Sequence, residues 1–371
     1  MTWGGWTMPP MKTCVPLRAF VSLLAIFVVS TIHAAGGKSP TWTDAADETL
    51  PADFAFQGEF AGDDIGVQVI ALGSGALHAV VYPGGLPGAG WDGKSRSLMA
   101  GALEDGKVAL QPAEGERRYL AKEPEKFSAS KDYPPAGQQS WSATIALRGK
   151  KGKKSARMTL VSPDGAKTKL KKNVRKSPTL GARPPKGAIV LFDGSNKDAF
   201  EGGRLDEATK LLNTDGSDIR TKKKFNNYTM HVEFMLPFRP DARGQGRGNS
   251  GFYQVDNYEV QVLDSFGLEG VNNECGGVYT KAKPLVNMCL PPLTWQTYDV
   301  TFRNAMAKDG EKIKNAFMTL KHNGVVIHDN LEITGKTGGS RKDPEGAPGP
   351  IRLQGHGNPL QYRNIWIVEE G

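Results

Sequence analysis

The sequence is poor in cysteine and histidine, with three of the first and six of the second in 371 residues. No Cys-x-x-Cys or His-x-x-x-His pair occurs, so thiol redox motifs and closely spaced zinc ligands find no support. Helical spacing of apolar residues is absent beyond stretches of a few residues. Neither a phosphate-binding glycine loop nor a Ser-His-Asp arrangement is indicated. These absences argue against nucleotide chemistry and serine-hydrolase chemistry.

Long hydrophobic runs are also scarce. The one candidate extends from Ala19 to Val29, follows Lys12 and Arg18, and leads into small residues near Ala34. This order is typical of a secretory signal peptide, here residues 1–35. The run is short for a membrane span, and no later segment is long and apolar enough to form one. We therefore expect a protein exported to the periplasm or the extracellular space, with a retained N-terminal anchor as the alternative.

The cysteines fit an exported chain. Cys14 lies in the predicted signal peptide, which leaves Cys275 and Cys289. Two cysteines in such a chain predict one disulfide that closes a short loop. The loop-entropy model assigns such a bond about 3 kcal/mol. A catalytic or metal-binding thiol is the alternative, although no second ligand motif accompanies either residue.

The positive charge is local. The net charge is +8 at pH 7, and residues 148–186 contain fourteen Lys and Arg against one acid, Asp164. No aromatic residues are interleaved for base stacking, so we expect no nucleic-acid partner. The run could bind an anionic cell-surface polymer. We interpret residues 166–187, rich in Lys and Pro, as a solvated linker.

The rest of the chain predicts two all-β domains. Short β-like runs separated by Gly and Pro indicate a small β-rich domain over residues 45–165. A second domain, residues 188–370, is long enough to enclose a full core. Its many short strands, with a hairpin signal at Asn323-Gly324, favour a β-sandwich of the jelly-roll kind.

The most informative strand lies within residues 247–265. Glu259 and Gln261 share one face of this strand because successive side chains point to opposite faces. The other face, directed at a core, carries Tyr258, Val260 and Val262. A face with carboxylate, amide and nearby hydroxyl groups suits a sugar. The alternative is the solvated face of a half-exposed strand.

Five motifs in one order resemble a known family. They are LFDG from residue 191, GNSG followed by YEVQVLDS from residue 248, PPLTWQTYDV from 291, HNGVVIHD from 322 and IRLQGHGNPLQYRNIWI from 351. Residues 188–369 are similar to the 3-keto-disaccharide hydrolase domain family, which has a concanavalin A-like jelly roll. The N-terminal domain resembles the β-region of planctomycete members. The resemblance implies an enzyme that cleaves the glycosidic bond of 3-keto-glycosides or 3-keto-disaccharides.

A ketone at C3 changes what such a site needs. An ordinary glycosidase uses two carboxylates, for which Glu274 or Asp256 could join Glu259 while Asp264 is structural by strand parity. The C3 ketone acidifies the hydrogen on C2, so one base can remove it and expel the C1 substituent, and water can then add. This route needs a base, a group that polarises the ketone and a proton donor. Direct hydrolysis stays open.

We predict Glu259 and His356 as the catalytic pair, since Gln354 and His356 share strand parity beside glycines. A surface histidine is the alternative for His356. The same pair could hold a divalent metal ion that polarises the ketone, although no tight ligand spacing supports one. The predicted substrate-binding residues are Arg247, Asn249, Gln261, Trp295, Gln354 and Arg363. Alternatively, Trp295 belongs to the core and Arg363 is a structural partner of Glu259.

A second class of function remains possible, a non-catalytic carbohydrate-binding module similar to a lectin. There the polar residues would only bind hydroxyl groups, and Trp295 would stack on a ring. An enzyme requires Glu259 and His356 in one cleft, with a pKa shifted toward neutrality. The sugar, its linkage and the oligomeric state are left open by the sequence.

Overall fold

The computed structural model describes residues 1–3, 40–114, 135, 137–150 and 154–370. From residue 40 onward, the described residues belong to one compact unit, Ser39–Gly371. The predicted signal peptide, residues 1–35, lies almost wholly outside the described residues. Within the described ranges, no helix is both long enough and apolar enough to cross a membrane.

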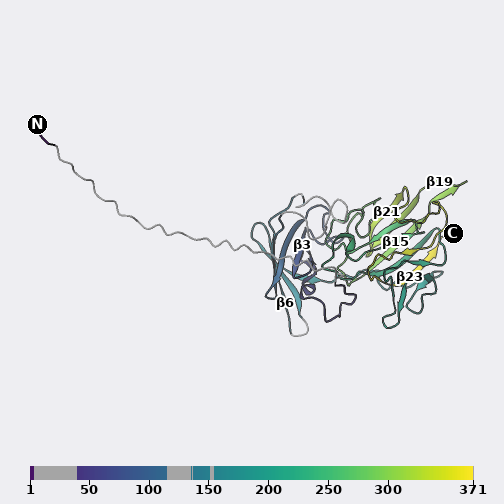
Figure 1. Cartoon of the computed structure of the whole chain (residues 1–371), viewed down its shortest axis with the longest axis horizontal. Helices are drawn as coiled ribbons and strands as arrows, with labels where there is room; N and C mark the ends of the chain where they lie inside the picture. Colours follow the sequence, from purple (N-terminus) through teal and green to yellow (C-terminus); the bar gives the residue numbers. More distant parts are fainter. Residues whose placement is uncertain (4–39, 115–134, 136, 151–153, 371) are drawn as a thin grey trace. The chain divides into compact units, whose positions relative to one another are not determined.

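The first part of the unit Ser39–Gly371 is a closed antiparallel barrel, in which Figure 1 labels β3 and β6. A short 3-10 helix, η1 (Ala52–Phe56), precedes it. The strands are β1 (Gly58–Ala61), β2 (Ile65–Ala71), β3 (Ala76–Pro83), β4 (Ser97–Glu104), β5 (Lys107–Pro112), β6 (Ser142–Arg148), β7 (Ser155–Val161) and β8 (Lys167–Asn173). Each strand pairs with the next, and β8 closes on β1. The predicted β-rich N-terminal domain is therefore confirmed as a fold class.

The barrel corrects the predicted linker. Residues 167–173, assigned from their lysines to a solvated linker, form β8 and complete the barrel. Leu170 is the one buried residue of this strand, and its lysines lie outside or half-buried. A single apolar residue in a lysine-rich run gives no visible period-two pattern, so the strand is hidden in the sequence. The connection is thus confined to residues 174–187.

The second part is a two-sheet β-sandwich, where Figure 1 labels β15, β21 and β23. The smaller sheet has the order β10 (Phe200–Glu201), β13 (Ile219–Thr221), β22 (Arg352–Leu353), β15 (Ser250–Gln254), β16 (Tyr258–Val262). The larger has the order β11 (Arg204–Asp206), β12 (Leu211–Asn213), β23 (Gln361–Glu369), β14 (Tyr228–Met235), β17 (Trp295–Arg303), β20 (Ala316–His322), β21 (Val325–Ile333), with β9 (Ile189–Phe192) on β23. A ribbon of β18 (Met306–Lys308) and β19 (Glu311–Lys314) and the 3-10 turn η2 (Gly244–Gly246) complete it. The all-β, jelly-roll prediction is confirmed.

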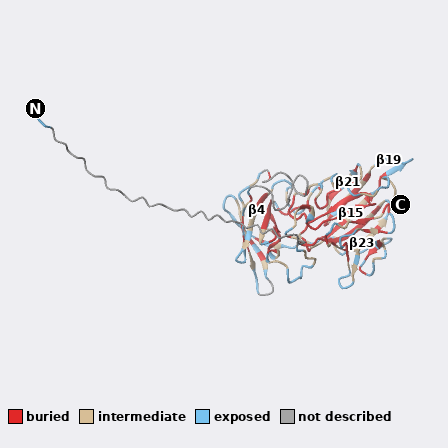
Figure 2. Ribbon diagram, in the orientation of Figure 1, coloured by how far each residue is buried: buried red, intermediate tan, exposed pale blue. Residues whose placement is uncertain are grey.

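The core lies between the two sandwich sheets and continues onto the barrel. Phe234, Phe252, Tyr298 and other buried side chains of both sheets form one cluster, which includes Ile70 and Val80 from the outside of the barrel. Barrel strands β2 and β3 are therefore buried on both faces, which explains their near-continuous apolar sequence. Figure 2 shows the buried residues concentrated in strands such as β15, whereas β19 is exposed.

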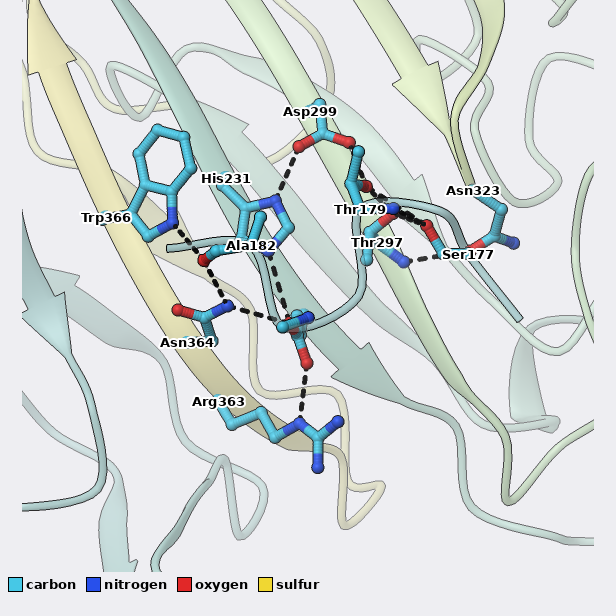
Figure 3. Close-up of polar contacts among 12 residues, drawn as sticks. Ser177, Thr179, Ala182, His231, Thr297, Asp299, Asn323, Arg363, Asn364 and Trp366 are labelled. Carbon is cyan, nitrogen blue, oxygen red and sulfur yellow. Dashed lines mark hydrogen bonds and ion pairs between the residues drawn. The ribbon is translucent and has the colours of Figure 1, made fainter. Parts of the chain in front are cut away.

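A buried polar cluster holds the connection against the outer face of the larger sheet (Figure 3). Glu233 accepts hydrogen bonds from the Gly181 backbone N–H (2.5 Å), from Asn364 (2.9 Å) and from Arg363 Nε (2.7 Å). His231 Nδ1 lies 2.6 Å from Asp299 Oδ1, and its Nε2 lies 3.5 Å from Glu233. Charge-assisted hydrogen bonds therefore dock the connecting segment on the sheet around residues 177–182, while residues 183–187 are exposed to solvent.

Charges in this cluster stabilise one another. Burial by itself raises the pKa of Glu233, but hydrogen bonds from His231, Asn364, Gly181 and Arg363 bring this pKa down to about 2. Burial by itself lowers the pKa of His231, and its contacts with Asp299 and Glu233 raise it above the ordinary histidine value. At neutral pH Glu233 is therefore ionised, and the contacts with Asp299 and Glu233 favour the protonated form of His231.

Candidate active site

The candidate site lies on the face of the smaller sheet that points away from the core. Phe252 of β15, Val260 of β16 and Leu353 of β22 point into the core. Because side chains alternate along a strand, Tyr253 and Glu259 lie on the opposite face, where they form a cross-strand pair. Glu259 and Gln261 thus share the face of the sheet that points away from the core, as the alternation predicts.

A tight hairpin turn fixes this pairing. The Asn257 N–H donates to the Gln254 carbonyl (3.0 Å), and the two residues between them, Val255 and Asp256, have φ of 45° and 57°. Positive φ at both central residues is typical of a type I′ turn, and the register, which pairs Gln254 with Tyr258, leaves three residues in the loop. A β-branched residue is unusual at such a position, so the sequence gives little sign of this turn.

A cleft of about 230 Å³ opens on this face. Its lining residues are Gln245, Asn249, Tyr253, Glu259, Gln261, Tyr279, Gly338, Gly339, Gln354 and His356. Both predicted catalytic residues and three predicted substrate-binding residues, Asn249, Gln261 and Gln354, therefore meet in one place. Glu259 is the one carboxylate among the described lining residues.

Glu259 is a buried carboxylate with a perturbed pKa. Glu259 is 4% exposed to solvent. Burial raises its pKa to about 7, although a hydrogen bond from Tyr253 (2.8 Å to Oε2) and the charge of Arg352 act in the opposite direction. Among the described residues, Oε1 has no hydrogen-bond partner, and a Cβ on Gly251 would lie 2.4 Å from it. Glycine at position 251 therefore leaves room for this oxygen.

Two buried amide oxygens in the cleft lack partners. The amide nitrogen of Asn249 donates to Gln245 O (2.9 Å), and that of Gln261 donates to Gln245 Oε1 (2.8 Å). Their other amide atoms, Asn249 Oδ1 and Gln261 Oε1, are buried and have no hydrogen-bond partner among the described residues. Unpaired buried acceptors are costly unless a ligand satisfies them. Together with Glu259 they favour a ligand that donates several hydroxyl hydrogens.

Arg352 packs against Tyr253 next to the site. Its guanidinium carbon lies 3.6 Å from the centre of the Tyr253 ring, and its Nε lies 2.8 Å from Asp256 Oδ1. Asp256 also accepts from Arg220. Asp256 is therefore part of an ion-pair network at the hairpin turn, outside the cleft, and not the second catalytic carboxylate that the sequence allowed.

His356 lies at the rim of the cleft and is exposed. The preceding Gly355 donates its N–H to Asp218 Oδ1 (2.9 Å). A Cβ at Gly355 would lie 2.3 Å from the backbone of Ser217. This close approach requires glycine and sets the path of the chain that carries His356.

Three predicted substrate-binding residues lie elsewhere. Arg247 is 4% exposed, pairs with Asp264 (2.8 Å) and donates to the Ala71 carbonyl, so it is structural. Its pairing agrees with the structural role predicted for Asp264. Trp295 and Arg363 belong to the larger sheet, where the Arg363 guanidinium stacks on the Trp295 ring at 4.0 Å. The structure thus places these three residues outside the Glu259 cleft; for Trp295 and Arg363 the reason is that strand parity cannot tell one sheet of a sandwich from the other.

Glu274, the other possible second carboxylate, is also structural. It is fully buried and accepts hydrogen bonds from the backbone N–H groups of Gly270 and Val271. Arg363 in turn has Glu233 as its carboxylate partner rather than Glu259. Glu259 thus has no guanidinium within hydrogen-bond distance among the described residues.

The predicted disulfide is absent from the structure. Cys275 and Cys289 are both free and fully buried. Cys275 Sγ lies 3.2 Å from the Tyr298 hydroxyl, and Cys289 donates to the Leu290 carbonyl at 3.5 Å. The two thiols are instead packed in the sandwich core, where cysteine behaves as a small apolar residue.

The suggested metal site also finds no support from side-chain geometry. Across the described ranges, no three His, Cys, Asp or Glu side chains gather in a way that could hold a metal ion. Glu259 has amides, phenols and one rim histidine as its neighbours in the cleft. We therefore assign neither Glu259 nor His356 as a metal ligand.

Several residues of the cleft were not predicted from the sequence. Tyr253 faces Glu259 only through the unpredicted turn, and Tyr279 reaches the site because its segment adds to the edge of β16, with Tyr279 N–H donating to the Glu259 carbonyl (3.0 Å). Gln245 comes from η2, and Gly338 and Gly339 come from the loop between β21 and β22. The one sequence signal was for Tyr253: it lies two residues after Gly251, so both side chains are on the same face of the strand.

A jelly-roll sandwich with an acceptor-rich cleft around one buried carboxylate is the architecture of a carbohydrate-active enzyme, of the class that cleaves glycosides. Residues 187–368 match the family described as the 3-keto-alpha-glucoside-1,2-lyase-like domain. The chain belongs to this family, as its motifs predicted.

Solved structures of three proteins from Parabacteroides distasonis, each described as a "putative glycosyl hydrolase", are similar to this chain. The first is 36% identical, with a TM-score of 0.47, and the match covers 50% of this chain and 85% of the other chain. The second is 18% identical, with a TM-score of 0.38, and covers 54% and 99%. The third is 18% identical, with a TM-score of 0.32, and covers 50% and 94%. No curated protein matches the chain.

Proposed function

We propose that this protein cleaves the glycosidic bond of 3-keto-glycosides or 3-keto-disaccharides, with Glu259 as the base. The observation that carries the proposal is the single carboxylate of the cleft, whose pKa lies at about 7. Ordinary glycosidases need two carboxylates flanking the scissile bond. A site with one carboxylate tuned to neutral pH suits a substrate whose own ketone assists the bond cleavage.

The proposed reaction begins with ionised Glu259 taking the proton from C2 of the keto sugar. The electron pair of that C–H bond forms the C1=C2 double bond, and the C1–O bond breaks with its electrons on the leaving oxygen. His356, at the rim, donates a proton to this oxygen. Water then adds its hydroxyl to C1 and gives its other proton to His356, while protonated Glu259 returns its proton to C2. These steps complete a net hydrolysis and restore both residues.

The cleft also suits the binding of one sugar ring. Asn249 Oδ1 and Gln261 Oε1 are free to accept hydrogen bonds from substrate hydroxyl groups. The volume of about 230 Å³ lies below the range of about 300–1,000 Å³ common for larger ligands. Half-buried Tyr279 provides an aromatic wall. The role that the sequence suggested for Trp295 is therefore better filled by Tyr279.

We expect release of the aglycone from a 3-keto-glucoside and none from the unoxidised parent. The parent lacks the ketone that acidifies C2, so one base cannot start the elimination. The measurement is aglycone release by the protein, with and without a chelator to report any metal requirement. Equal turnover of both substrates would contradict the proposal. Binding of both without turnover would favour the lectin-like alternative.

We expect kcat/KM for the keto substrate to fall as the pH drops below about 7. Glu259 acts as the base only when ionised, and burial raises its pKa to about 7, so protonation removes the active form at a pH where an ordinary carboxylate is still ionised. The measurement is kcat/KM from pH 5 to 9. An acidic limb near the ordinary carboxylate value of about 4.3 would contradict the role of a buried Glu259.

We propose export to the periplasm or the extracellular space through the signal-peptide pattern of residues 1–35. Secretion of a reporter fused behind these residues tests this part independently of the activity.

A further inference from the structure

Tyr253 lies between Glu259 and the loop of residues 334–351 that joins β21 to β22. Its hydroxyl oxygen lies 2.8 Å from Glu259 Oε2 and 2.9 Å from the Gly338 carbonyl oxygen. Gly338 and Gly339 line the cleft together with Glu259 and Tyr279. One phenol therefore contacts both the proposed base and the loop that borders the substrate.

A phenol has one proton and cannot donate to both acceptors at once. When Glu259 is ionised, the carboxylate is the stronger acceptor, so the phenol proton goes to it. The Gly338 carbonyl then faces an oxygen with no hydrogen between them. When Glu259 is protonated, its O–H can donate to the Tyr253 oxygen, and the phenol proton is free for Gly338. Only the protonated form of Glu259 completes the chain of hydrogen bonds.

The surroundings allow the loop to respond. Gly338 is exposed, so its carbonyl can bind water when it leaves Tyr253. The base of the loop is held separately, because Thr337 N–H donates to Asn257 O (3.0 Å) and Arg352 Nη2 donates to Gly339 O (2.7 Å). A Cβ at Gly339 would lie 3.0 Å from the Tyr253 hydroxyl. The contact with Tyr253 thus ties Gly338 to the Glu259 carboxyl group, whereas the Glu259 backbone N–H separately donates to Thr337 Oγ1 (2.9 Å).

The groups that face Glu259 come from every element around it. They are Tyr253 of β15, Arg352 of β22, Tyr279 of the edge segment and His356 after β22, with Asp218 and Asp256 acting through Arg352. Burial and the nearby Glu259 raise the pKa of Tyr253, so the phenol keeps its proton at neutral pH. Glu259 is the member of the Tyr253 hydrogen-bond chain that changes its charge.

We propose that Tyr253 is a positioning residue that couples Glu259 to loop 334–351, holding Gly338 against the cleft while Glu259 carries a proton and releasing it when Glu259 is ionised. This inference rests on the proposed function for its meaning. Glu259 carries the proton taken from C2 while the unsaturated intermediate is in the site, so the loop stays closed until water has added. Ionised Glu259 then leaves the loop free to open for product release and substrate entry.

The test is hydrogen exchange of a peptide covering residues 334–341, without substrate, from pH 5.5 to 8.5 and corrected for intrinsic exchange rates. In the native protein we expect loop opening to increase about two- to tenfold as the pH rises through about 7, the worth of one hydrogen bond. In Tyr253→Phe protein this step should vanish. In Glu259→Gln protein opening should stay low at all pH values, because an amide N–H can replace the carboxyl O–H.

Tyr258→Phe is the matched control. Tyr258 lies next to Glu259 on β16 and donates to Glu345 Oε1 (2.8 Å), a residue of the same loop, without contacting Glu259. This variant also loses a phenol–loop hydrogen bond and should keep the pH step. The inference is overturned if native protein shows no step, or if Tyr253→Phe retains it. Because no substrate is used, these outcomes are independent of whether 3-keto sugars are cleaved.

Discussion

Glu259→Gln protein is expected to lose about 10²- to 10⁴-fold in kcat/KM on a 3-keto-glycoside, the usual contribution of a general base. The amide has the size of the carboxyl group but cannot accept a proton from C2. Glu259 is the one carboxylate among the described lining residues of the cleft, so no neighbour can replace it there. The measurement is the initial rate of aglycone release at pH 8, where Glu259 is ionised in the native protein.

Loss of fold would be a poor explanation for this result. The folded pKa of Glu259 is raised to about 7, so its contribution to stability is present below the ordinary carboxylate pKa of about 4.3 and is lost as the pH rises through about 7. At pH 8 the neutral amide should therefore unfold no more easily than the native side chain. Glu207→Gln, at an exposed site, is the control. Activity of Glu259→Gln within threefold of native would remove Glu259 from the mechanism.

Glu233→Gln is expected to lower the free energy of unfolding by about 3 kcal/mol, in the range measured when one partner of a buried ion pair is removed. Glu233 is fully buried and accepts from the backbone of Gly181, from Asn364 and from Arg363. A neutral amide accepts at one oxygen only, and its N–H₂ group would face the Arg363 donor. It would also remove one of the two carboxylates that contact His231 among the described residues and leave Asp299.

Urea unfolding of Glu233→Gln against native protein, again with Glu207→Gln as control, measures this cost. The pKa of Glu233 is lowered to about 2, so its stabilisation is present above the ordinary carboxylate pKa and is lost as the pH falls toward 2. The pKa of His231 is raised, so its share is present below its unfolded pKa and is lost as the pH rises through the folded value. A difference below 1 kcal/mol at pH 7 would show that the cluster is not stabilising.

Local pattern predicted the fold and the centre of the site. The alternation in Tyr258–Val262 placed Glu259 and Gln261 on one face, and Asn323-Gly324 forms the turn between β20 and β21 with φ of 50° and 80°. These features depend on neighbouring residues only, so one sequence is enough to see them.

The misplaced residues depend on contacts between distant segments. Trp295 and Arg363 have the right chemistry for a sugar site but lie in the other sheet, and that is set by which strands pair. Arg247 is held by the barrel carbonyl of Ala71, a contact across 176 positions of the chain. Likewise, Tyr253 meets Glu259 through a turn with a left-handed valine, which no common turn motif announces.

The docked connection has a consequence for where the hydrolase-like domain can be cut. The family match begins at residue 187, yet the backbone groups that seal Glu233 and Trp366 belong to Gly181 and Ala182, and Thr179 donates to Asp299. A fragment beginning at the family boundary would leave a buried carboxylate and an indole without these partners. The segment matched by the family is therefore shorter than the segment needed to complete the sandwich. The difference is the stretch from Thr179 to residue 186, which is part of the connection between the barrel and the sandwich.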